Sequence, residues 1–187
     1  MPSSSQFAPD RLADRAEIQH RVHQFCHAVD RLQLDELREV FHADGIDDHG
    51  AYKGDVDGFI KWVANRHQTI AYSAHHVSNT MIEFLSDDSA FVETYFLVWQ
   101  SVNPQASLFA SDGDAQPFEA ISSGRYVDHF TRKDGRWAIQ SRTTVPGSMT
   151  RAVGNEGMGM VPGFAVGSRN ADDPAITRRA ELVEATR

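Results

Sequence analysis

The spacing of apolar residues changes near Ser73, and this change limits the folds that the chain can adopt. Before Ser73, apolar residues recur every three or four positions, which is typical of helices with one buried face. After Ser73, the chain is rich in Val, Ile, Phe, Tyr, Trp and Thr, which is typical of strands. Three helices followed by antiparallel strands predict an α+β fold.

Three helical segments are expected before that point. The first has Asp10 as its predicted N-cap, and its apolar stripe contains Ile18, Val22, Phe25, Val29 and Leu32. The second covers residues 34–41 and is expected to end at the turn signal Asp44-Gly45. The third begins after Asp55, a predicted N-cap, and its stripe contains Val56, Phe59, Ile60 and Val63.

A brief strand is expected at residues 45–49, and four longer strands cover residues 74–84, 90–102, 118–131 and 136–145. The turn residues between them, such as Asp134-Gly135, indicate hairpins. In the second of the four, alternation places Phe91, Tyr95 and Trp99 on one face and Phe96 and Val98 on the other. Since only one of these apolar faces can fill the core, we expect a homodimer or homotrimer that covers the second.

At 187 residues, the chain is expected to form one domain over residues 11–145. Residues 1–10 lack the basic and apolar regions of an export signal, which predicts a disordered lead-in and a cytoplasmic protein. Residues 146–187 form a Gly-rich tail that ends in a short helix starting at Asp173-Pro174. The tail has two interpretations: a disordered extension, or a lid in which part of residues 149–164 covers a pocket or a neighbouring subunit.

Charge and composition argue against several classes of partner. A net charge of −8 disfavours nucleic acid, and no apolar run is long enough to span a membrane. The single Cys26 excludes an internal disulfide, and its place on the first helix favours a buried, inert thiol. His23, His27 and Asp30 share a helix face but are a weak metal signal, and no phosphate-binding loop is present. We therefore expect neither a metal nor an organic cofactor.

Asp30 and His75 are the first candidates for chemistry. A carboxylate that holds one ring nitrogen of an imidazole leaves the other free to carry protons. Strand alternation sends His75 and His76 to opposite faces, so only one of them can face a pocket. The simpler alternatives are a solvated helix end for Asp30 and, for His75, a strand histidine that binds backbone or water.

Several motifs in residues 16–145 resemble the SnoaL-like group of the nuclear-transport-factor-2-like superfamily. These are VDR at 29–31, LDELREVF at 34–41, YKG at 52–54, the His75-x-x-x-Asn79 segment, Tyr126-x-Asp128 and RKDGRW at 132–137. Within the group, the chain is similar to scytalone dehydratase, bile acid 7α-dehydratase and hexachlorocyclohexane dehydrochlorinase. The resemblance implies a cone-shaped α+β barrel, in which N-terminal helices pack on a curved, mainly antiparallel sheet around one apolar pocket.

The resemblance also implies site residues. Asp30 and His75 fall where these relatives keep an Asp–His pair, and Arg142 falls where the dehydrochlorinase keeps a pocket arginine. The alternative for Arg142 is an exposed arginine on the last strand. The tyrosine that the dehydratases place beside the pair is replaced by Phe25 or Val29.

Two further positions depart from scytalone dehydratase. A second tyrosine falls on His49, and a second catalytic histidine falls near Trp99 or Gln100. Scytalone itself is therefore a poor candidate for the substrate.

Other polar residues are assigned to faces by alternation. Asp47 and His49 point to one side of a short strand, so that His49 ranks second as a proton carrier. Tyr126 and Asp128 share one face of a later strand, so that Tyr126 can donate a hydrogen bond into a cavity or pack at a subunit interface.

These features predict a cofactor-independent lyase that acts on a small apolar, aromatic or polycyclic alcohol. The catalytic residues would be His75 and Asp30, with substrate contacts from His49, Tyr126, Arg142, Trp99 and Phe25. The reaction would be a dehydratase-type elimination or a retro-aldol cleavage that releases an aldehyde. Two alternatives remain open: a non-catalytic binding or assembly subunit, and a cofactor-free isomerase or epoxide hydrolase that uses an aspartate base.

Overall fold

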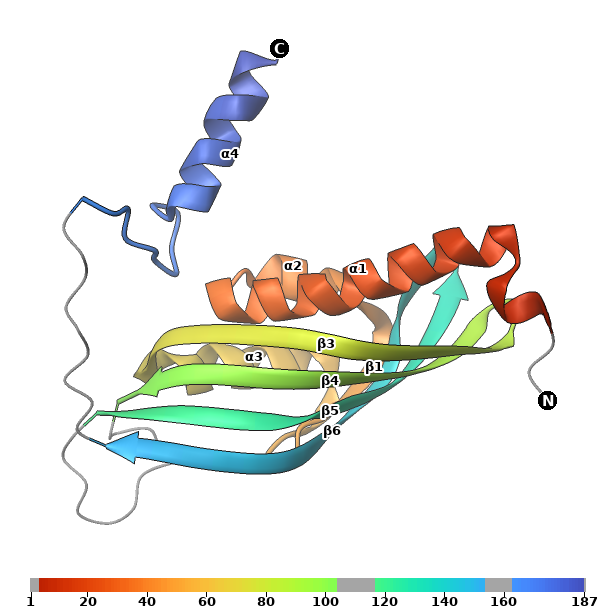
Figure 1. Cartoon of the computed structure of the whole chain (residues 1–187), viewed down its shortest axis with the longest axis horizontal. Coiled ribbons are helices and arrows are strands. Elements are labelled where there is room, and N and C mark those ends of the chain that lie inside the picture. Colours follow the sequence, from red (N-terminus) through yellow and green to blue (C-terminus); the bar gives the residue numbers. More distant parts are fainter. Residues whose placement is uncertain (1–3, 104–116, 154–162, 187) are drawn as a thin grey trace.

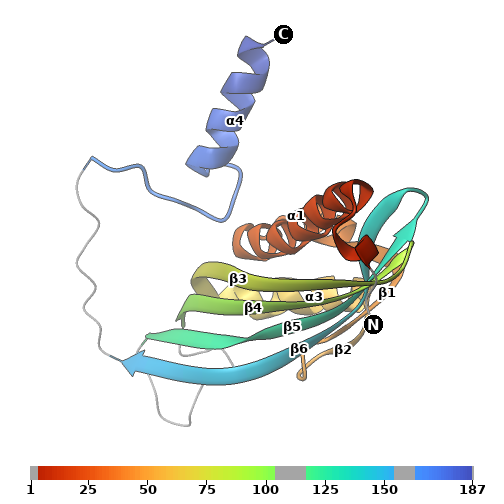
Figure 2. The same cartoon turned by 45° about the vertical axis from the view of Figure 1, so that its right-hand side comes forward.

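A curved sheet of six strands forms the frame of the protein (Figures 1 and 2). The computed structural model describes residues 4–103, 117–153 and 163–186. The strands are β1 (Phe41–Asp48), β2 (Lys53–Asp55), β3 (Ile70–Ser86), β4 (Ser89–Val102), β5 (Phe118–Lys133) and β6 (Arg136–Val153). Their order is β2-β1-β6-β5-β4-β3, and the pairing is antiparallel except between β1 and β6.

Helices cover the inner face of this sheet. They are α1 (Pro9–Arg31), α2 (Leu34–Glu39) and α3 (Val56–Arg66), and short 3-10 turns occur at Ser4–Phe7 and His67–Thr69. A fourth helix, α4 (Pro174–Ala185), projects away from the other elements (Figure 1). The predicted α+β fold with helices on a curved, mainly antiparallel sheet is confirmed, but the sheet remains open and does not close into a barrel.

The predicted apolar stripe of α1 is buried. Ile18, Val22, Phe25 and Val29 are each at most 5% exposed and pack in one core with residues of α3 and the sheet. Leu32 then leaves the helical conformation with a positive φ of 54°, and its N–H donates to carbonyls of the last turn. The stripe therefore fixes which side of α1 faces the sheet, and Leu32 fixes where the helix ends.

Two predicted helix boundaries are wrong. Helix α1 begins at Pro9 after Ala8, so Asp10 is not its N-cap, because a proline is well suited to the first helical position. Helix α2 ends at Glu39, and Asp44-Gly45 lies inside β1 where the pairing with β6 shifts register. A Cβ on Gly45 would lie 2.9 Å from the carbonyl oxygen of His42, so the glycine permits a bulge where a turn was expected.

The predicted caps of the other helices are confirmed. Asp55 accepts a hydrogen bond from the N–H of Gly58 (2.8 Å) at the start of α3. Asp173 accepts one from the N–H of Ala175 (2.9 Å) at the start of α4. Short polar side chains before a helix satisfy N–H groups that have no partner inside it.

The last strand is longer than predicted, because β6 does not end at residue 145 but continues to Val153. Pro146 lies opposite Gly124 of β5, beyond Thr143, the last position at which β6 pairs with β1. A proline lacks the N–H for a second ladder and is tolerated at such an edge. The first part of the expected tail is therefore a strand.

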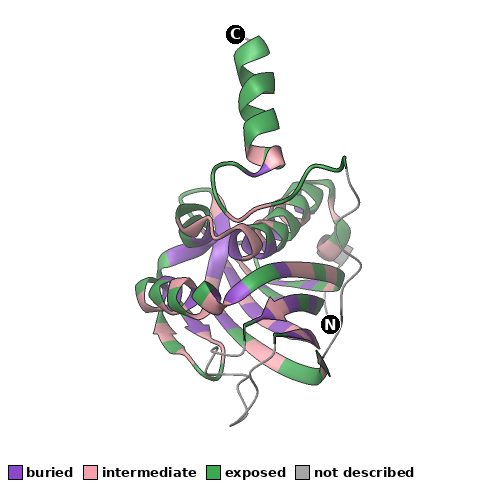
Figure 3. Cartoon of the chain, turned by 90° about the vertical axis from the view of Figure 1, so that its left-hand side faces the viewer, coloured by how far each residue is buried: buried purple, intermediate pink, exposed green. Residues whose placement is uncertain are grey.

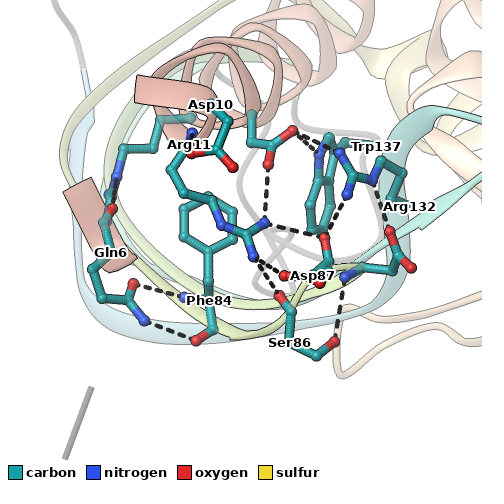
Figure 4. A network of polar contacts seen from close by, with 11 residues as sticks. Gln6, Asp10, Arg11, Phe84, Ser86, Asp87, Arg132 and Trp137 are labelled. Atoms are coloured by element: carbon teal, nitrogen blue, oxygen red, sulfur yellow. Dashed lines mark hydrogen bonds and ion pairs between the residues drawn. The ribbon is translucent and has the colours of Figure 1, made fainter. Parts of the chain in front are cut away.

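Polar contacts hold the N-terminal end of α1 (Figure 4). Of the lead-in predicted at residues 1–10, residues 1–3 lie outside the described residues, and a 3-10 turn at Ser4–Phe7 precedes the helix. Gln6 exchanges two hydrogen bonds with the backbone of Phe84, at 2.8 and 3.0 Å. Arg11 lies 4.5 Å over the ring of Phe84 and binds Asp14 and the β3–β4 turn at Asp87. These contacts hold the end of α1 that lies farthest from Asp30.

The two faces of the sheet differ in burial (Figure 3). In β4, the inward side chains of Phe96 and Val98 are at most 9% exposed, whereas Phe91, Tyr95 and Trp99 are 39 to 45% exposed on the outer face. The predicted division of these residues between two faces is confirmed. None of the helices in the described part of the chain is long and apolar enough to span a membrane.

Candidate active site

A cavity of about 520 Å³ lies between the inner face of the sheet and helices α1 and α3. Its apolar lining comes mainly from aromatic rings: Phe25, Phe59, Trp62, Phe96 and Tyr126. Its polar lining includes His49, Arg66, His67, His75, Gln100, Ser122, Ser123 and Thr144. A mainly apolar cavity of this size with a few polar groups is typical of a small-molecule site.

Asp30 and His75 meet at this cavity. Asp30 belongs to the last turn of α1 and His75 to β3, and Oδ1 of Asp30 lies 2.6 Å from Nδ1 of His75. The other oxygen, Oδ2, accepts a hydrogen bond from the backbone N–H of His75 at 2.7 Å. The contact expected between the two side chains is therefore formed, and it leaves Nε2 of a cavity-lining histidine for a bound molecule. His76 is exposed, as strand alternation predicts.

A second line of contacts holds Asp30 from the side of the sheet. The hydroxyl of Ser73 donates to Oδ1 of Asp30 (2.7 Å) and accepts from Gln100 (3.3 Å), whose Oε1 accepts from Arg66 (3.1 Å). Burial by itself raises the pKa of Asp30, but the hydrogen bonds from His75 and Ser73 outweigh it and hold the pKa below its ordinary value. The carboxylate therefore stays charged at neutral pH and can orient the imidazole.

His49 lines the same cavity from the end of β1. Its Nδ1 contacts Oδ1 of Asp47, which is fully buried, while Asp48 pairs with the exposed Lys53. The prediction that Asp47 and His49 share one side of the strand is confirmed. Of the three histidines that line this cavity, His49 and His75 are therefore each bonded to a carboxylate of their own.

Tyr126 lines the cavity, but Arg142 does not. Two nitrogens of Arg142 lie 2.7 Å from the two carboxylate oxygens of Asp128, and both residues are at most 1% exposed. The guanidinium also lies 4.1 Å from the ring centres of Phe25 and of Tyr126. The prediction that Arg142 binds substrate needs correction, because its guanidinium contacts a buried carboxylate and two aromatic rings and does not line the cavity.

Trp99 is the second correction. It lies on the outer face of β4, 43% exposed, and its indole N–H donates to Glu119. The next residue, Gln100, lines the cavity and bonds to Ser73 and Arg66. Of the two positions that the sequence left open, strand alternation therefore brings Gln100 to the site.

Two residues near the site, Arg169 and His67, were not anticipated. Arg169 donates to the carbonyl oxygens of Val29, Asp30 and Ile70 at 2.7 to 2.9 Å, and it lies 2.7 Å from Nδ1 of His67. Burial and the adjacent guanidiniums of Arg66 and Arg169 lower the pKa of His67 to about 2. Nothing in the sequence near Arg169 indicates these contacts, since its partners lie about 100 or more residues away.

A second hollow of about 550 Å³ lies on the other side of Asp30 and His75. It is lined by α1, β3 and residues 166–169 and 173 of the C-terminal segment. Arg31 pairs with Asp173, which is 2% exposed, so this segment is held against the end of α1. The Asp–His contact therefore lies between two cavities.

The lid predicted within residues 149–164 can be located only in part. Met149 belongs to β6 and lines the 520 Å³ cavity, Phe164 is exposed, and residues 154–162 lie outside the described residues.

Helix α1 carries the histidines considered for metal binding and the thiol of Cys26. Among the described residues, no three His, Cys, Asp or Glu side chains are grouped so that they could hold a metal ion. Cys26 is buried, and this burial raises the pKa of its thiol to about 12. Such a thiol is unreactive at neutral pH.

Comparison with known proteins agrees with this architecture. A family model for the SnoaL-like domain matches residues 10–143. No curated protein matches the chain significantly. The match to the family model confirms the predicted resemblance to the SnoaL-like group.

Three solved structures illustrate the likeness. A type 2 hexachlorocyclohexane dehydrochlorinase is 20% identical, with a TM-score of 0.70 over 83% of this chain and 98% of its own. A type 3 enzyme from Novosphingobium barchaimii is 21% identical, with a TM-score of 0.68 over 82% and 97%. A candidate scytalone dehydratase from Novosphingobium aromaticivorans is 20% identical, with a TM-score of 0.61 over 74% and 87%. At these identities the likeness shows a shared fold.

Proposed function

This chain belongs to the SnoaL-like family, and from that premise we propose that it is a cofactor-independent lyase. Its substrate would be a small apolar alcohol with an aromatic or polycyclic frame. One observation carries the proposal: the carboxylate of Asp30 holds Nδ1 of His75 at 2.6 Å beside an aromatic-lined cavity.

In this mechanism, Asp30 keeps the proton of His75 on Nδ1, so that Nε2 presents a lone pair to the substrate. Nε2 removes a proton from a carbon next to an activating carbonyl group. The electrons of the C–H bond form a carbon–carbon double bond, and the hydroxyl on the neighbouring carbon leaves with the C–O electrons. The departing oxygen takes up a proton from a protonated imidazole in the cavity and leaves as water. Histidine is suited to this step because its ordinary pKa is close to neutral pH.

The rest of the cavity supports a substrate of this class. Aromatic side chains provide apolar surface for a ring system, and 520 Å³ is within the range of sites for small organic molecules. Tyr126 and Gln100 add polar groups that can orient a carbonyl or hydroxyl oxygen.

Two other functions receive less support. A non-catalytic subunit would not require Asp30 and His75 to meet, whereas the two side chains are in contact. An isomerase or epoxide hydrolase with Asp47 as its base would need that carboxylate in the cavity. Asp47 is fully buried and contacts His49, and it is His49 that lines the cavity.

The proposal is tested with the aldol adduct of benzaldehyde and acetone, a β-hydroxyketone with an aromatic ring. Elimination of water gives benzylideneacetone, and retro-aldol cleavage gives benzaldehyde, so the product identifies the reaction. We expect His75→Ala to lower turnover by about 10²-fold or more, the usual scale for a positioned acid–base group. Asp30→Asn should also lower turnover, because the amide cannot stabilise a charged imidazole.

The matched control is His76→Ala, which removes an exposed imidazole from the opposite face of the same strand. It should leave turnover within about twofold, and circular dichroism should show the same fold for all variants. Near-normal turnover by His75→Ala, or no turnover by the unaltered protein, would count against the lyase.

A further inference from the structure

A second carboxylate–imidazole pair, Asp47 and His49, lies beside the cavity, which His49 lines together with His75. His49 directly follows β1, and its backbone N–H donates to the carbonyl of Tyr52 at 2.8 Å. In the sheet order, strands β6, β5 and β4 separate β1 from β3, which carries His75. The sheet is curved (Figure 2), and both histidines line the same cavity from strands that are not neighbours in the sheet.

The ring of His49 is fixed in orientation. It stacks on Phe59 with 4.9 Å between ring centres and an interplanar angle of 27°, and Trp62 lies 5.7 Å away. Its side chain is only 17% exposed, and Nδ1 is occupied by Asp47. Nε2 is therefore the ring nitrogen that remains for a molecule in the cavity.

The charges behind His49 suit a proton donor. Asp47 and Asp128 are fully buried and Arg142 is 1% exposed, so this group holds two carboxylates and one guanidinium. Asp47 lies opposite Arg142 in the β1–β6 pairing, and Arg142 binds Asp128. The cluster behind His49 therefore contains one more carboxylate than guanidinium groups.

We propose that His49 is the general acid of the elimination and that Asp47 is its positioning residue. This inference rests on the lyase function proposed above. As Nε2 of His75 takes the carbon-bound proton, the proton on Nε2 of His49 passes to the departing oxygen. The C–O bond breaks with its electron pair on that oxygen, and water leaves. His75 ends protonated and His49 neutral, and proton exchange with solvent restores both.

The assignment narrows the substrate class. Hydroxide is a poor leaving group and needs a proton as it departs, whereas carboxylates and halides leave without one. A cavity that holds a separate acid is therefore suited to alcohols in preference to halides or esters. Each histidine then performs one proton transfer, which a single imidazole would otherwise perform in two directions.

The test compares two leaving groups on one carbon frame: the aldol adduct of benzaldehyde and acetone, and its O-acetyl ester. Both give benzylideneacetone, so one absorbance assay follows both reactions. We expect His49→Phe, which keeps a ring against Phe59, to lower kcat on the alcohol by about 10²-fold and on the ester by less than about threefold. Asp47→Asn should show the same selectivity with a smaller loss on the alcohol.

The ester also reports whether the site is intact in each variant. Asp48→Asn is the matched control, since Asp48 adjoins Asp47 but pairs with Lys53. Equal losses on alcohol and ester in His49→Phe would overturn the general acid and leave a structural role. Unchanged turnover of the alcohol would overturn it as well. If His75→Ala lost both reactions while His49→Phe kept normal turnover of both, the lyase would stand and only this inference would be rejected. No turnover of either compound by the unaltered protein would reject the lyase itself.

Discussion

At the scale of single residues, the polar side chains around the cavity are controlled by partners from distant parts of the sequence. His67 is the strongest case, because it is 4% exposed and lies against two arginines, Arg66 and Arg169. Burial and these two positive charges lower its pKa to about 2, so the folded protein keeps it neutral.

Because His67 stays neutral in the folded protein, we expect the free energy of unfolding to decrease in mild acid. The unfolded chain binds a proton at His67 below its ordinary pKa of 6.5, and the folded chain does not until about pH 2. Since the unfolded state binds more protons between these values, stability is lost as pH falls through 6.5. From about pH 7.5 to about pH 5.5, His67 should cost about 1.4 kcal/mol in the free energy of unfolding.

Urea unfolding of the unaltered protein and of His67→Gln at both pH values measures this contribution. Other histidines titrate in both proteins, so the difference between their pH dependences isolates His67. If the free energies of unfolding of the two proteins changed equally with pH, the pKa of His67 would not be lowered in the folded state.

At the scale of elements, the C-terminal segment of residues 166–173 is attached to the functional end of α1. Arg169 binds three backbone carbonyls at the junction of α1 and β3, and Asp173 pairs with Arg31. A cation at the C-terminal end of a helix also interacts favourably with its unpaired carbonyls. The segment therefore shields the backbone that carries Asp30.

Arg169→Ala is expected to release this segment. Hydrogen exchange of the backbone amides in residues 166–173 should become at least about tenfold faster, because their anchoring contacts are lost. Ser168, whose N–H donates to Asp173 at 2.9 Å, is the most direct probe. Arg178→Ala is the control, since Arg178 is exposed on α4 and pairs with the exposed Glu181. Unchanged exchange in Arg169→Ala would mean that other contacts hold the segment.

At the scale of the whole molecule, the outer face of the sheet carries a group of exposed apolar side chains. Its exposed side chains include Tyr72, Met81, Phe91, Tyr95, Leu97 and Trp99. The helices α1, α2 and α3 of the described residues cover the inner face, and these outer side chains are exposed in the single chain. Contiguous apolar surfaces of this kind are typical of interfaces.

We expect this face to form a homodimer or homotrimer. Light scattering should give two or three times the chain mass of 20.8 kDa, and Leu97→Glu should shift the protein toward the monomer because it buries a charge. Leu12→Glu, at an exposed position of α1, should not change the mass. A mass of 20.8 kDa for the unaltered protein would contradict the expectation.

Local patterns in the sequence were enough to predict the helices, the four long strands and their faces, but not strand β2 or the ends of several elements. The α1 stripe, the alternation in β4 and the caps Asp55 and Asp173 depend on neighbours within a few residues, so the sequence alone determined them. The chemistry of a carboxylate and an imidazole made Asp30 and His75 the first candidates, and the resemblance to a known family then favoured them as a pair.

Only the tertiary structure decided which polar groups face the cavity. Arg142 is occupied by Asp128 and two rings, Trp99 faces outward, and Arg169 reaches carbonyls about 100 or more residues away. These outcomes depend on strand register, sheet curvature and the return of a distant segment. Such long-range contacts leave no periodic signal in the sequence, because the energy of burying or pairing a side chain depends on which residues the fold brings beside it.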